Sequence, residues 1–276
     1  MRIVIMGPAG KMGRLVVREA LRRRPQFMIV GGVVPEGRDY VRLDIGKATG
    51  DGFVGALLYD HLEWIIPVSE GVIDFTTPEC TMETIKECID HNKPLVIGTT
   101  GFSEIELKRI EHAATKIPIL MAATTSTTDH LMYEFVKKAA KVLDKADVEI
   151  IDMHDRNKND APSGTAVEMG KLIAEARGQE FNEVADFGRD SKREEGHIGF
   201  HSVRSGDITS THTVIFGMEG ERLEITHRAY NFEIYANGAL DAMLFLKGKP
   251  PGLYTFNDVL EEKARKAEQG LPLAEF

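Results

Sequence analysis

A short stretch near the middle of the chain combines side chains that suit acid catalysis and anion binding. His154, Arg156 and Lys158 lie within five residues of one another, and Asp160 follows them. An imidazolium or ammonium group can donate a proton to a reacting substrate, and cations attract carboxylates. The next segment, Pro162–Thr165, predicts a helix start whose N–H groups and hydroxyls bind an anion. A solvated, charged loop is the alternative for the same residues.

Two kinds of element are predicted to position this stretch. The apolar and β-branched residues of Val148–Met153 predict a strand that carries His154 at its end. The spacing of apolar residues in Ala161–Ala176 predicts a helix after the turn, and Leu131–Leu143 predicts an amphipathic helix before the strand. The functional groups are therefore expected between a strand end and a helix start.

The N-terminal segment predicts a second functional site. Arg2–Met6 has the composition of a buried strand, a glycine turn follows it, and Arg14–Arg23 has helical spacing. Glycines in such a turn let the backbone approach a pyrophosphate, which the helix N-terminus then binds. A purely structural turn is the alternative, because the spacing is Gly-x-x-Gly-x-x-Gly. The residues expected at a dinucleotide are Gly7, Gly10, Lys11, Met12 and Gly13.

Further strand–helix units follow along the first half of the chain. Phe27–Val34, Gly71–Phe75, Pro94–Thr100 and Ile117–Ala123 predict strands, and Ser103 with Glu106 forms a capping box that starts a helix. Alternation of strands and helices at this spacing indicates a parallel sheet covered on both faces. Ligands bind beyond the carboxyl ends of such strands. The loop residues expected at a cofactor are Glu36, on the ribose, and Phe75, Thr76, Gly98, Thr99, Thr100, Ala122, Ala123 and Thr125.

The pattern changes after Ser126. Residues 199–230 alternate apolar and polar side chains, which predicts two or three antiparallel strands broken at 205–207 and 219–220. With the helices on either side of His154, these strands predict a separate α+β layer. The fold class is therefore α/β: a Rossmann-like dinucleotide-binding domain with an inserted α+β domain.

Composition excludes several classes of function. The chain has 276 residues and a formal net charge of −9, with its acidic residues spread along the sequence, which argues against a nucleic-acid-binding surface. Its N-terminus shows no cationic leader and no long apolar run, so we expect a cytoplasmic protein that does not bind membranes. Cys80 and Cys88, with His91 nearby, have poor spacing for a metal site, and no metal is predicted.

Seven motifs, in order along nearly the whole chain, resemble those of one enzyme family. They are GxxGxMG at 7–13, DFTxP at 74–78, VIGTTGF at 96–102, HxxxKxDAPSGTA at 154–166, RxGDI at 204–208, ERLEITH at 221–227 and ANGA at 236–239. The chain is similar to the 4-hydroxy-tetrahydrodipicolinate reductases, also called dihydrodipicolinate reductases, of lysine and diaminopimelate synthesis.

The resemblance implies specific roles. It implies a dinucleotide-binding domain of residues 1–126 and 237–276, and a substrate-binding domain of residues 127–236 whose sheet forms a homotetramer. His154 would be the catalytic acid, and Lys158 an acid or a substrate anchor. Ser163, Gly164 and Thr165 would hold a carboxylate of the substrate. The chemistry agrees, because hydride transfer to a conjugated imine must be followed by protonation of carbon.

The sequence departs from the family pattern at three places. Thr124-Thr125-Ser126 replaces the usual Asn-Phe-Ser, Asp155 replaces the second histidine of a His-His-Arg run, and Phe232 replaces an arginine. A carboxylate at Asp155, in the expected substrate site, and a lost cation should weaken binding of a doubly anionic substrate. The substrate could therefore be a different imine, enamine or amino acid, and a cofactor-binding sensor without turnover is a third reading.

The resemblance also implies a nicotinamide cofactor, NADH or NADPH. Family members that bind the 2′-phosphate carry an arginine beside the acidic residue after the second strand, whereas here Glu36 is followed by Gly37 and then Arg38. The Glu36 carboxylate would accept from the ribose hydroxyls and repel a phosphate, although Arg38 and Lys11 partly offset this. NADH is therefore slightly favoured.

Overall fold

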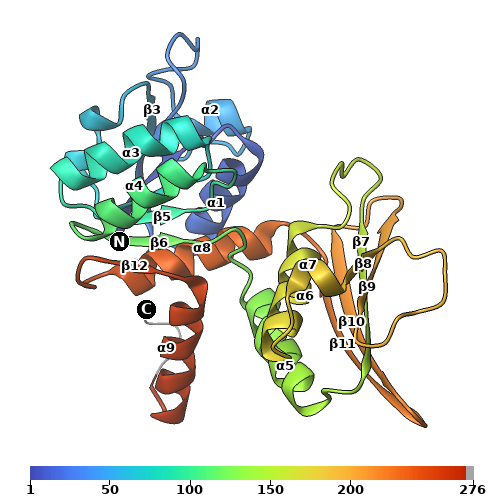
Figure 1. The fold of residues 1–276 in the computed structure, drawn as a ribbon. Coiled ribbons are helices and arrows are strands. Elements are labelled where there is room, and N and C mark those ends of the chain that lie inside the picture. Colours follow the sequence, from blue (N-terminus) through green and yellow to red (C-terminus); the bar gives the residue numbers. More distant parts are fainter. Residues whose placement is uncertain (272–276) are drawn as a thin grey trace. The chain divides into compact units, whose positions relative to one another are not determined.

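The computed structural model describes residues 1–271, which form two units. One unit comprises Met1–Thr127 together with the segment that begins at Phe232, and the other comprises Thr128–Asn231. The predicted boundary between residues 236 and 237 falls inside a helix, α8 (Glu233–Leu246). This helix begins one residue after Phe232, where the chain returns to the first unit. Each unit has its own sheet (Figure 1).

Seven parallel strands form the sheet of the first unit. Their order is β12-β6-β5-β4-β1-β2-β3. The strands are β1 (Arg2–Met6), β2 (Met28–Val33), β3 (Leu57–Tyr59), β4 (Gly71–Asp74), β5 (Leu95–Ile97), β6 (Pro118–Met121) and β12 (Gly252–Tyr254). The predicted parallel sheet is confirmed. β3 and β12 were not predicted, because each has only three residues and β3 also lies in a glycine-rich segment.

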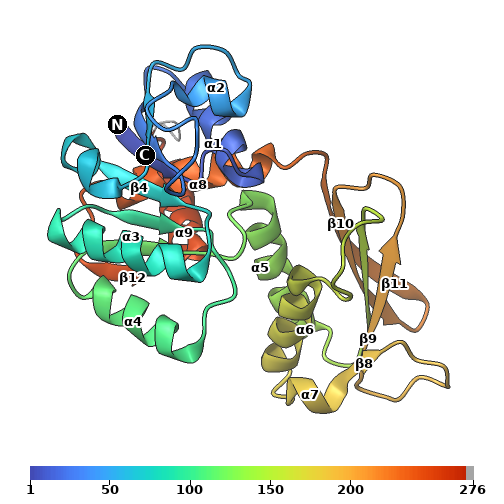
Figure 2. The same ribbon diagram turned by 90° about the horizontal axis from the view of Figure 1, so that it is seen from above.

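Helices cover both faces of this sheet, as Figures 1 and 2 show. They are α1 (Lys11–Arg22), α2 (Ile45–Thr49), α3 (Pro78–Asp90), α4 (Glu104–Ala114), α8 and α9 (Phe256–Glu268), and two 3₁₀ turns span Leu62–Trp64 and Ile66–Val68. Residues of α3 and α4 pack in the core on one face, and those of α1, α8 and α9 pack in the core on the other. The predicted capping box of Ser103 and Glu106 is present at the start of α4.

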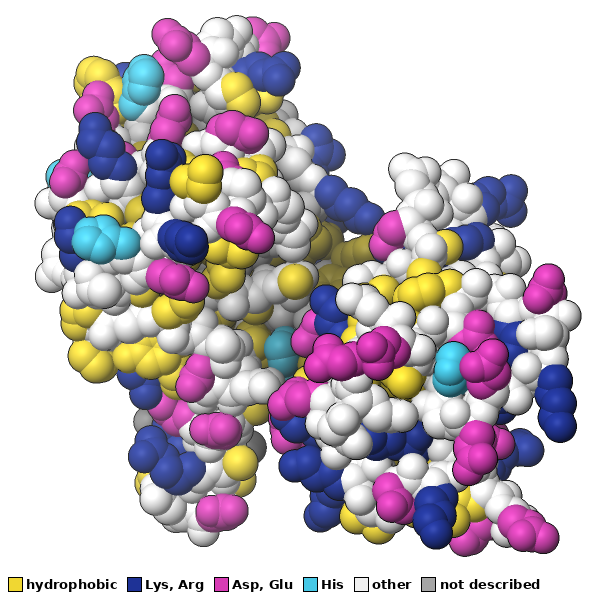
Figure 3. Space-filling model, in the orientation of Figure 1, with side chains coloured by type: hydrophobic (Ala, Val, Ile, Leu, Met, Phe, Trp, Pro, Cys, Tyr) yellow, Lys and Arg dark blue, Asp and Glu magenta, His cyan; other side chains and the backbone are white. Residues whose placement is uncertain are grey.

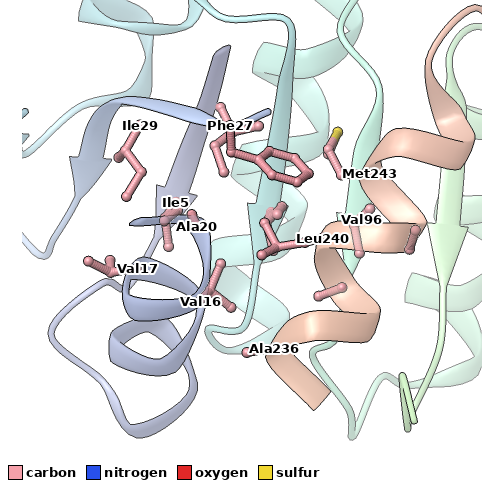
Figure 4. Close-up of a cluster of buried hydrophobic side chains, with 14 of the residues drawn as sticks. Ile5, Val16, Val17, Ala20, Phe27, Ile29, Val96, Ala236, Leu240 and Met243 are labelled. Carbon is pink, nitrogen blue, oxygen red and sulfur yellow. The ribbon is translucent and has the colours of Figure 1, made fainter. Parts of the chain in front are cut away.

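Figure 4 shows why α8 belongs to the first unit although it follows the whole inserted segment. Ala236, Leu240 and Met243 of α8 point into the same cluster as Val16 and Val17 of α1. All five side chains are fully buried. Burial of apolar side chains stabilises a fold by roughly 25 cal/mol for each Å² removed from water, so this contact fastens the returning chain to the sheet.

The sheet of the second unit is mixed. Its order is β11-β10-β7-β9-β8. The strands are β7 (Asp147–His154), β8 (Ala185–Phe187), β9 (Ile198–Arg204), β10 (Ser210–Met218) and β11 (Glu221–Ala229), and the helices are α5 (Thr127–Val142), α6 (Gly164–Ala176) and α7 (Phe181–Val184). Apolar residues of α5 and α6 pack against β7, β9 and β10.

The prediction that the strands of residues 199–230 are all antiparallel is wrong for β9. β9 pairs in parallel with β7 and β8, while β10 pairs antiparallel with β7 and β11. Its connection to β10 passes the end of β7, where the Ser205 N–H donates to the carbonyl of His154 at 2.9 Å. β9 and β10 therefore lie on opposite sides of β7. The pairing of β9 with β7 joins residues far apart in the chain, so no local sequence pattern predicts it.

Surface composition agrees with a mixed charge pattern. Acidic and basic side chains are interspersed on the face of the molecule in Figure 3. Among residues 1–271, the structure contains no helix that is both long and apolar enough to cross a bilayer.

Candidate active site

The glycine turn after β1 has the geometry of a dinucleotide loop. Gly7 has a φ of +64°, which side-chain-bearing residues rarely adopt. A Cβ on Gly13 would lie 2.1 Å from the carbonyl oxygen of Gly7, so the close approach of turn and helix requires glycine there. Gly10 is the N-cap of α1 and offers no side chain to the N–H groups of the first turn. A cofactor pyrophosphate therefore fits this helix start.

The other predicted cofactor loops follow β4, β5 and β6, which lie in this order on one side of β1 in the sheet. Thr76 and Thr99 link two of these loops, because the Thr76 N–H donates to Thr99 Oγ1 at 3.1 Å. Gly98 packs against the ring of Phe75, which a Cβ there would overlap at 2.0 Å. The loops thus lie at one edge of the sheet. They contain Phe75, Thr76, Gly98, Thr99, Thr100, Ala122 and Ala123.

Asp74, at the end of β4, was not predicted to have a role of its own. Its Oδ1 accepts from the N–H and the hydroxyl of Thr76 at 2.9 and 2.6 Å. Burial raises the pKa of the Asp74 carboxyl, and hydrogen bonds from nearby threonines partly oppose that rise. Asp74 therefore holds the backbone of the Phe75–Thr76 loop in place through Thr76.

Two of the divergent positions, Phe232 and Thr125, lie in the first unit; Phe232 is the N-cap of α8, and Thr125 contacts that helix. The Lys11 ammonium lies 3.6 Å from the centroid of the Phe232 ring, a cation–π contact. The Thr125 hydroxyl donates to the carbonyl of Tyr235 at 2.5 Å. Phe232 thus contacts the glycine-turn lysine, whereas the sequence had suggested that its substitution affects the substrate side. Glu36 lies exposed in the loop after β2.

The predicted catalytic stretch lies at one end of the sheet of the second unit. The buried residues of β7 are Val148, Ile150, Asp152 and His154. Asp152 and His154 therefore occupy positions on the face that packs against helices, where apolar residues are expected. On β10, Ser210 and His212 stand in phase with the buried Val214 and Phe216. Register places His212 beside Asp152, and Arg204 beside His154. The inner face of the sheet is therefore apolar at one end and polar at the other.

Asp152 is the centre of this polar end. It is 1% exposed, and Arg204 grips it with both guanidinium nitrogens, Nη1 to Oδ1 at 3.3 Å and Nη2 to Oδ2 at 3.1 Å. The same Oδ2 accepts from the Ser163 N–H at 2.8 Å and lies 3.5 Å from Nδ1 of His154. Burial alone would raise the pKa of this carboxyl, but hydrogen bonds from His154, Arg204 and others lower it well below its usual range. Asp152 is thus an anion at neutral pH.

Ser163 is the N-cap of α6, inside the predicted helix start at residues 162–165, although the helix itself begins at Gly164 and not at Ala161. Its hydroxyl accepts from the Ala166 N–H at 3.2 Å and lies 3.0 Å from Nε2 of His212. The side chain is buried, with an exposed fraction of 2%. Gly164 is exposed and Thr165 is half-buried, so their N–H groups form the open part of the predicted carboxylate cradle, which Ser163 anchors.

Lys158 and Asp155 lie in the loop between β7 and α6. The Lys158 ammonium pairs with Asp160 at 2.8 Å, and this contact lowers the pKa of the Asp160 carboxyl. Asp160 is exposed, so a substrate carboxylate can compete for the same cation. Asp155 Oδ1 accepts from the Asn157 N–H at 2.8 Å and so helps to shape its own loop.

A second imidazole–carboxylate pair adjoins His212. Nδ1 of His227 lies 2.6 Å from Oδ1 of Asp129, and its Nε2 lies 2.9 Å from the Thr128 hydroxyl. The donor atoms of Asp129, His212 and His227, and those of Asp152, His154 and His212, are close enough together for a metal ion. In the structure these atoms form the ion-pair contacts of His154 with Asp152 and of His227 with Asp129, and His212 lies beside the hydroxyl of Ser163.

Asp129, Asp152, His212 and His227 were not among the predicted site residues. Asp152 and His212 could have been found, because each is a polar residue in phase with the buried apolar residues of its strand. The pairing of Asp129 with His227 leaves no comparable signal, since it joins residues from opposite ends of the unit's sequence.

Comparisons with known proteins agree with this architecture. Residues 1–125 match the family described as "Dihydrodipicolinate reductase, N-terminus", and residues 130–260 match "Dihydrodipicolinate reductase, C-terminus". A 4-hydroxy-tetrahydrodipicolinate reductase of Pseudomonas fluorescens is 42% identical over 264 residues, which cover 94% of this chain and 98% of that protein.

Solved structures share the fold. A dipicolinate-bound dihydrodipicolinate reductase from Paenisporosarcina sp. TG-14 is 26% identical, with a TM-score of 0.74 over 92% of this chain and 97% of that one. A scyllo-inositol dehydrogenase from Lactobacillus casei, with bound NAD(H) and scyllo-inositol, is 11% identical, with a TM-score of 0.56 over 98% and 95% of the two chains, and shows the fold alone. Matched in both of its segments and along nearly its whole length, the chain belongs to the dihydrodipicolinate reductase family.

Proposed function

We propose that the chain reduces 4-hydroxy-tetrahydrodipicolinate to tetrahydrodipicolinate, in the synthesis of lysine and diaminopimelate. As a member of this family it is an oxidoreductase that uses a nicotinamide cofactor. The observation that carries the proposal is the polar end of the second unit. There the buried Asp152 carboxylate contacts the imidazole of His154 and the N-cap of α6, and the loop between them carries the ammonium group of Lys158.

The residues of this polar end have distinct roles in the proposal. Gly164 and Thr165 bind one substrate carboxylate through the first N–H groups of α6. His154 turns Nδ1 toward Asp152, which leaves Nε2 as the nitrogen that protonates the reduced substrate. Lys158 exchanges Asp160 for the substrate and holds its charge in place. The bound nicotinamide would supply the hydride.

The residues of the first unit would hold that cofactor. The N–H groups at the start of α1 would bind the pyrophosphate, and Glu36 would accept from the ribose hydroxyls. Because Glu36 lies exposed in the loop after β2 and carries a negative charge, we propose that NADH binds at least as well as NADPH. Lys11, which Phe232 covers, stands at the first position of α1 and supports the pyrophosphate.

We further propose that the protein is a cytoplasmic homotetramer. Its cysteines, Cys80 and Cys88, are both free thiols, as expected in a reducing compartment. β11 is an edge strand with mostly exposed residues, and an unpaired edge of this kind is suited to association between copies. Sedimentation of the purified protein measures its oligomeric state.

A second candidate substrate is an imine or enamine that carries an amino group in place of one carboxylate. The Asp155 carboxylate, in the loop that holds Lys158, favours it. The deciding experiment follows NADH oxidation with freshly generated 4-hydroxy-tetrahydrodipicolinate and with a panel of cyclic imines. Turnover of the dicarboxylate at least tenfold more efficient than that of any other compound supports the first proposal. Preference for an amine-bearing compound supports the second, and no turnover of any compound contradicts both.

A further inference from the structure

His212 is a buried polar residue at a position where an apolar side chain would pack. It is 1% exposed and stands on β10 in phase with Val214 and Phe216 of the apolar core. Its cross-strand neighbours are Asp152 on β7 and His227 on β11. Burial of a polar group is costly unless it is hydrogen-bonded, and departures of this kind gather at functional sites.

Both ring nitrogens of His212 have hydroxyl partners. Nε2 lies 3.0 Å from Ser163 Oγ, and Nδ1 lies 3.4 Å from Ser210 Oγ. Burial lowers the pKa of His212 to about 4, with Asp129 opposing this shift and His154 adding to it. The imidazole is therefore neutral at pH 7, with one nitrogen that donates and one that accepts.

The partner hydroxyl on Ser163 determines where α6 begins. Ser163 Oγ accepts from the Ala166 N–H, and the Ser163 N–H donates to Asp152, so the residue is fixed from three directions. Gly164 and Thr165 follow it directly. Their N–H groups can grip a carboxylate only if this first turn keeps its position.

His212 also supports the predicted acid. Its ring meets that of His154 edge to face, with 5.2 Å between the ring centroids. Asp152 fixes one nitrogen of His154, and the contact with His212 restricts the plane of the ring. One side chain thus contacts both the carboxylate cradle and the imidazole.

We propose that His212 is a positioning residue, which aligns the first turn of α6 through Ser163 and aligns the ring of His154 by direct packing. The inference rests on the proposed function in one respect, because it takes the ligand of the cradle to be a dicarboxylate. A neutral ring suits a positioning role, because it forms hydrogen bonds without adding a charge that would attract the substrate directly.

The test compares His212→Phe with His212→Gln. Phenylalanine fills the space without hydrogen bonds, whereas glutamine keeps an N–H donor near the place of Nε2. We expect His212→Phe to weaken binding of pyridine-2,6-dicarboxylate about tenfold in calorimetry, and to lower kcat as well as raise KM. Glutamine should restore dicarboxylate binding to within about threefold of wild type, and affinity for NADH should stay unchanged in both variants.

A double-mutant cycle tests the route through Ser163. In a Ser163→Ala background, His212→Phe should have little further effect on dicarboxylate binding, because the contact it removes is already absent. His201→Phe is the matched control. His201 is exposed, lies on β9 and pairs with Glu149, so its replacement should leave dicarboxylate binding unchanged.

Unchanged dicarboxylate affinity in folded His212→Phe would overturn the inference, and so would fully additive effects of the two substitutions. Hydrogen exchange separates this failure from failure of the proposed function. If wild type binds no dicarboxylate, the proposed function fails. The positioning role is then judged by the amides of Ser163 and Ala166, whose N–H groups are hydrogen-bonded to Asp152 and to Ser163 Oγ. They should exchange at least tenfold faster in His212→Phe than in wild type, and they contradict the role if they do not.

Discussion

Asp152 Oδ2 lies 3.5 Å from Nδ1 of His154 and, at 2.8 Å, accepts the N–H of Ser163. A single buried carboxylate oxygen therefore relates the predicted acid to the start of the predicted carboxylate cradle. Arg204 balances its charge, which allows an anion to be buried at this position.

Replacing Asp152 with asparagine should impair both catalysis and stability. Asparagine keeps the acceptor for Ser163 but leaves the Arg204 guanidinium without its anion, so we expect a loss of about 2 kcal/mol in the free energy of unfolding. Without the carboxylate at Nδ1 of His154, kcat should fall at least tenfold. Urea unfolding and steady-state kinetics measure both effects.

Asp147→Asn is the control. Asp147 lies on the same strand but has an exposed side chain, so its replacement should change stability by less than about 0.5 kcal/mol. Equal behaviour of the two variants would contradict the role of Asp152.

Alanine at His154 or Lys158 should lower turnover by roughly 10²- to 10⁴-fold, because each removes a group that acts on the reacting substrate. Affinity for NADH should stay within about twofold of wild type, since both residues belong to the second unit and the glycine turn belongs to the first. Stopped-flow kinetics and cofactor titration measure the two quantities. Lys171→Ala, an exposed lysine of α6, is the control. Turnover within a few-fold of wild type in the His154 and Lys158 variants would mean that the stretch is only a charged loop.

Glu36 should determine cofactor preference. Wild type is expected to bind NADH at least as tightly as NADPH, and Glu36→Gln should shift the ratio of the two dissociation constants several-fold toward NADPH by removing the charge that repels the 2′-phosphate. Calorimetric titration of each cofactor measures the ratio, with Glu111→Gln on α4 as a control of equal charge change. A tenfold preference of wild type for NADPH, about 1.4 kcal/mol, is the outcome that rules this out.

Asp155 should discriminate against a second substrate carboxylate. Asp155→Asn keeps an oxygen that can accept from the Asn157 N–H, so the loop should retain its shape while losing one negative charge. We expect KM for the dicarboxylate to fall by a few-fold, since a charge at a partly exposed site is worth about 1 kcal/mol or less. Asp155→His, which restores the family residue, should change KM in the same direction. For an amine-bearing substrate both changes should raise KM. If KM is unchanged on both kinds of substrate, Asp155 does not face the ligand.

The free energy of unfolding should decrease as pH falls, because the buried His212 resists protonation in the folded chain. Its folded-state pKa is lowered to about 4, whereas in the unfolded chain it should be near 6.5. Between these values the unfolded chain binds a proton that the folded chain excludes, so the free energy of unfolding decreases as pH falls from 6.5 to 4. The charged and titratable groups that face it, Asp129, Asp152, His154 and His227, are present in both wild type and variant. Relative to His212→Phe, wild type should lose about 2 kcal/mol between pH 7 and pH 5, measured by urea unfolding at each pH. His201→Phe should keep the wild-type slope, and a His212→Phe slope equal to that of wild type would refute the assignment.

Local sequence was sufficient for most elements of the fold. β1 begins and ends where its composition predicted, and the capping box at Ser103 starts α4 as expected. Gly7 and Gly13 could be identified because a positive φ and a close backbone approach admit little else. Such features depend on residues near one another in the chain, and their backbone preferences are therefore visible without the fold.

Only the tertiary structure decided which strands are neighbours and which side chains meet. β9 lies parallel to β7, and the short strand β3 joins the sheet, because burial of both faces favours pairings that no local pattern specifies. The contact of Lys11 with Phe232 and the pairing of Asp129 with His227 join residues about a hundred positions apart or more. Residue types and spacing were thus enough to predict a strand that leads to His154 and a helix start near Ser163. The groups that contact these residues were fixed by long-range packing, which the sequence expresses only through the energy of the whole fold.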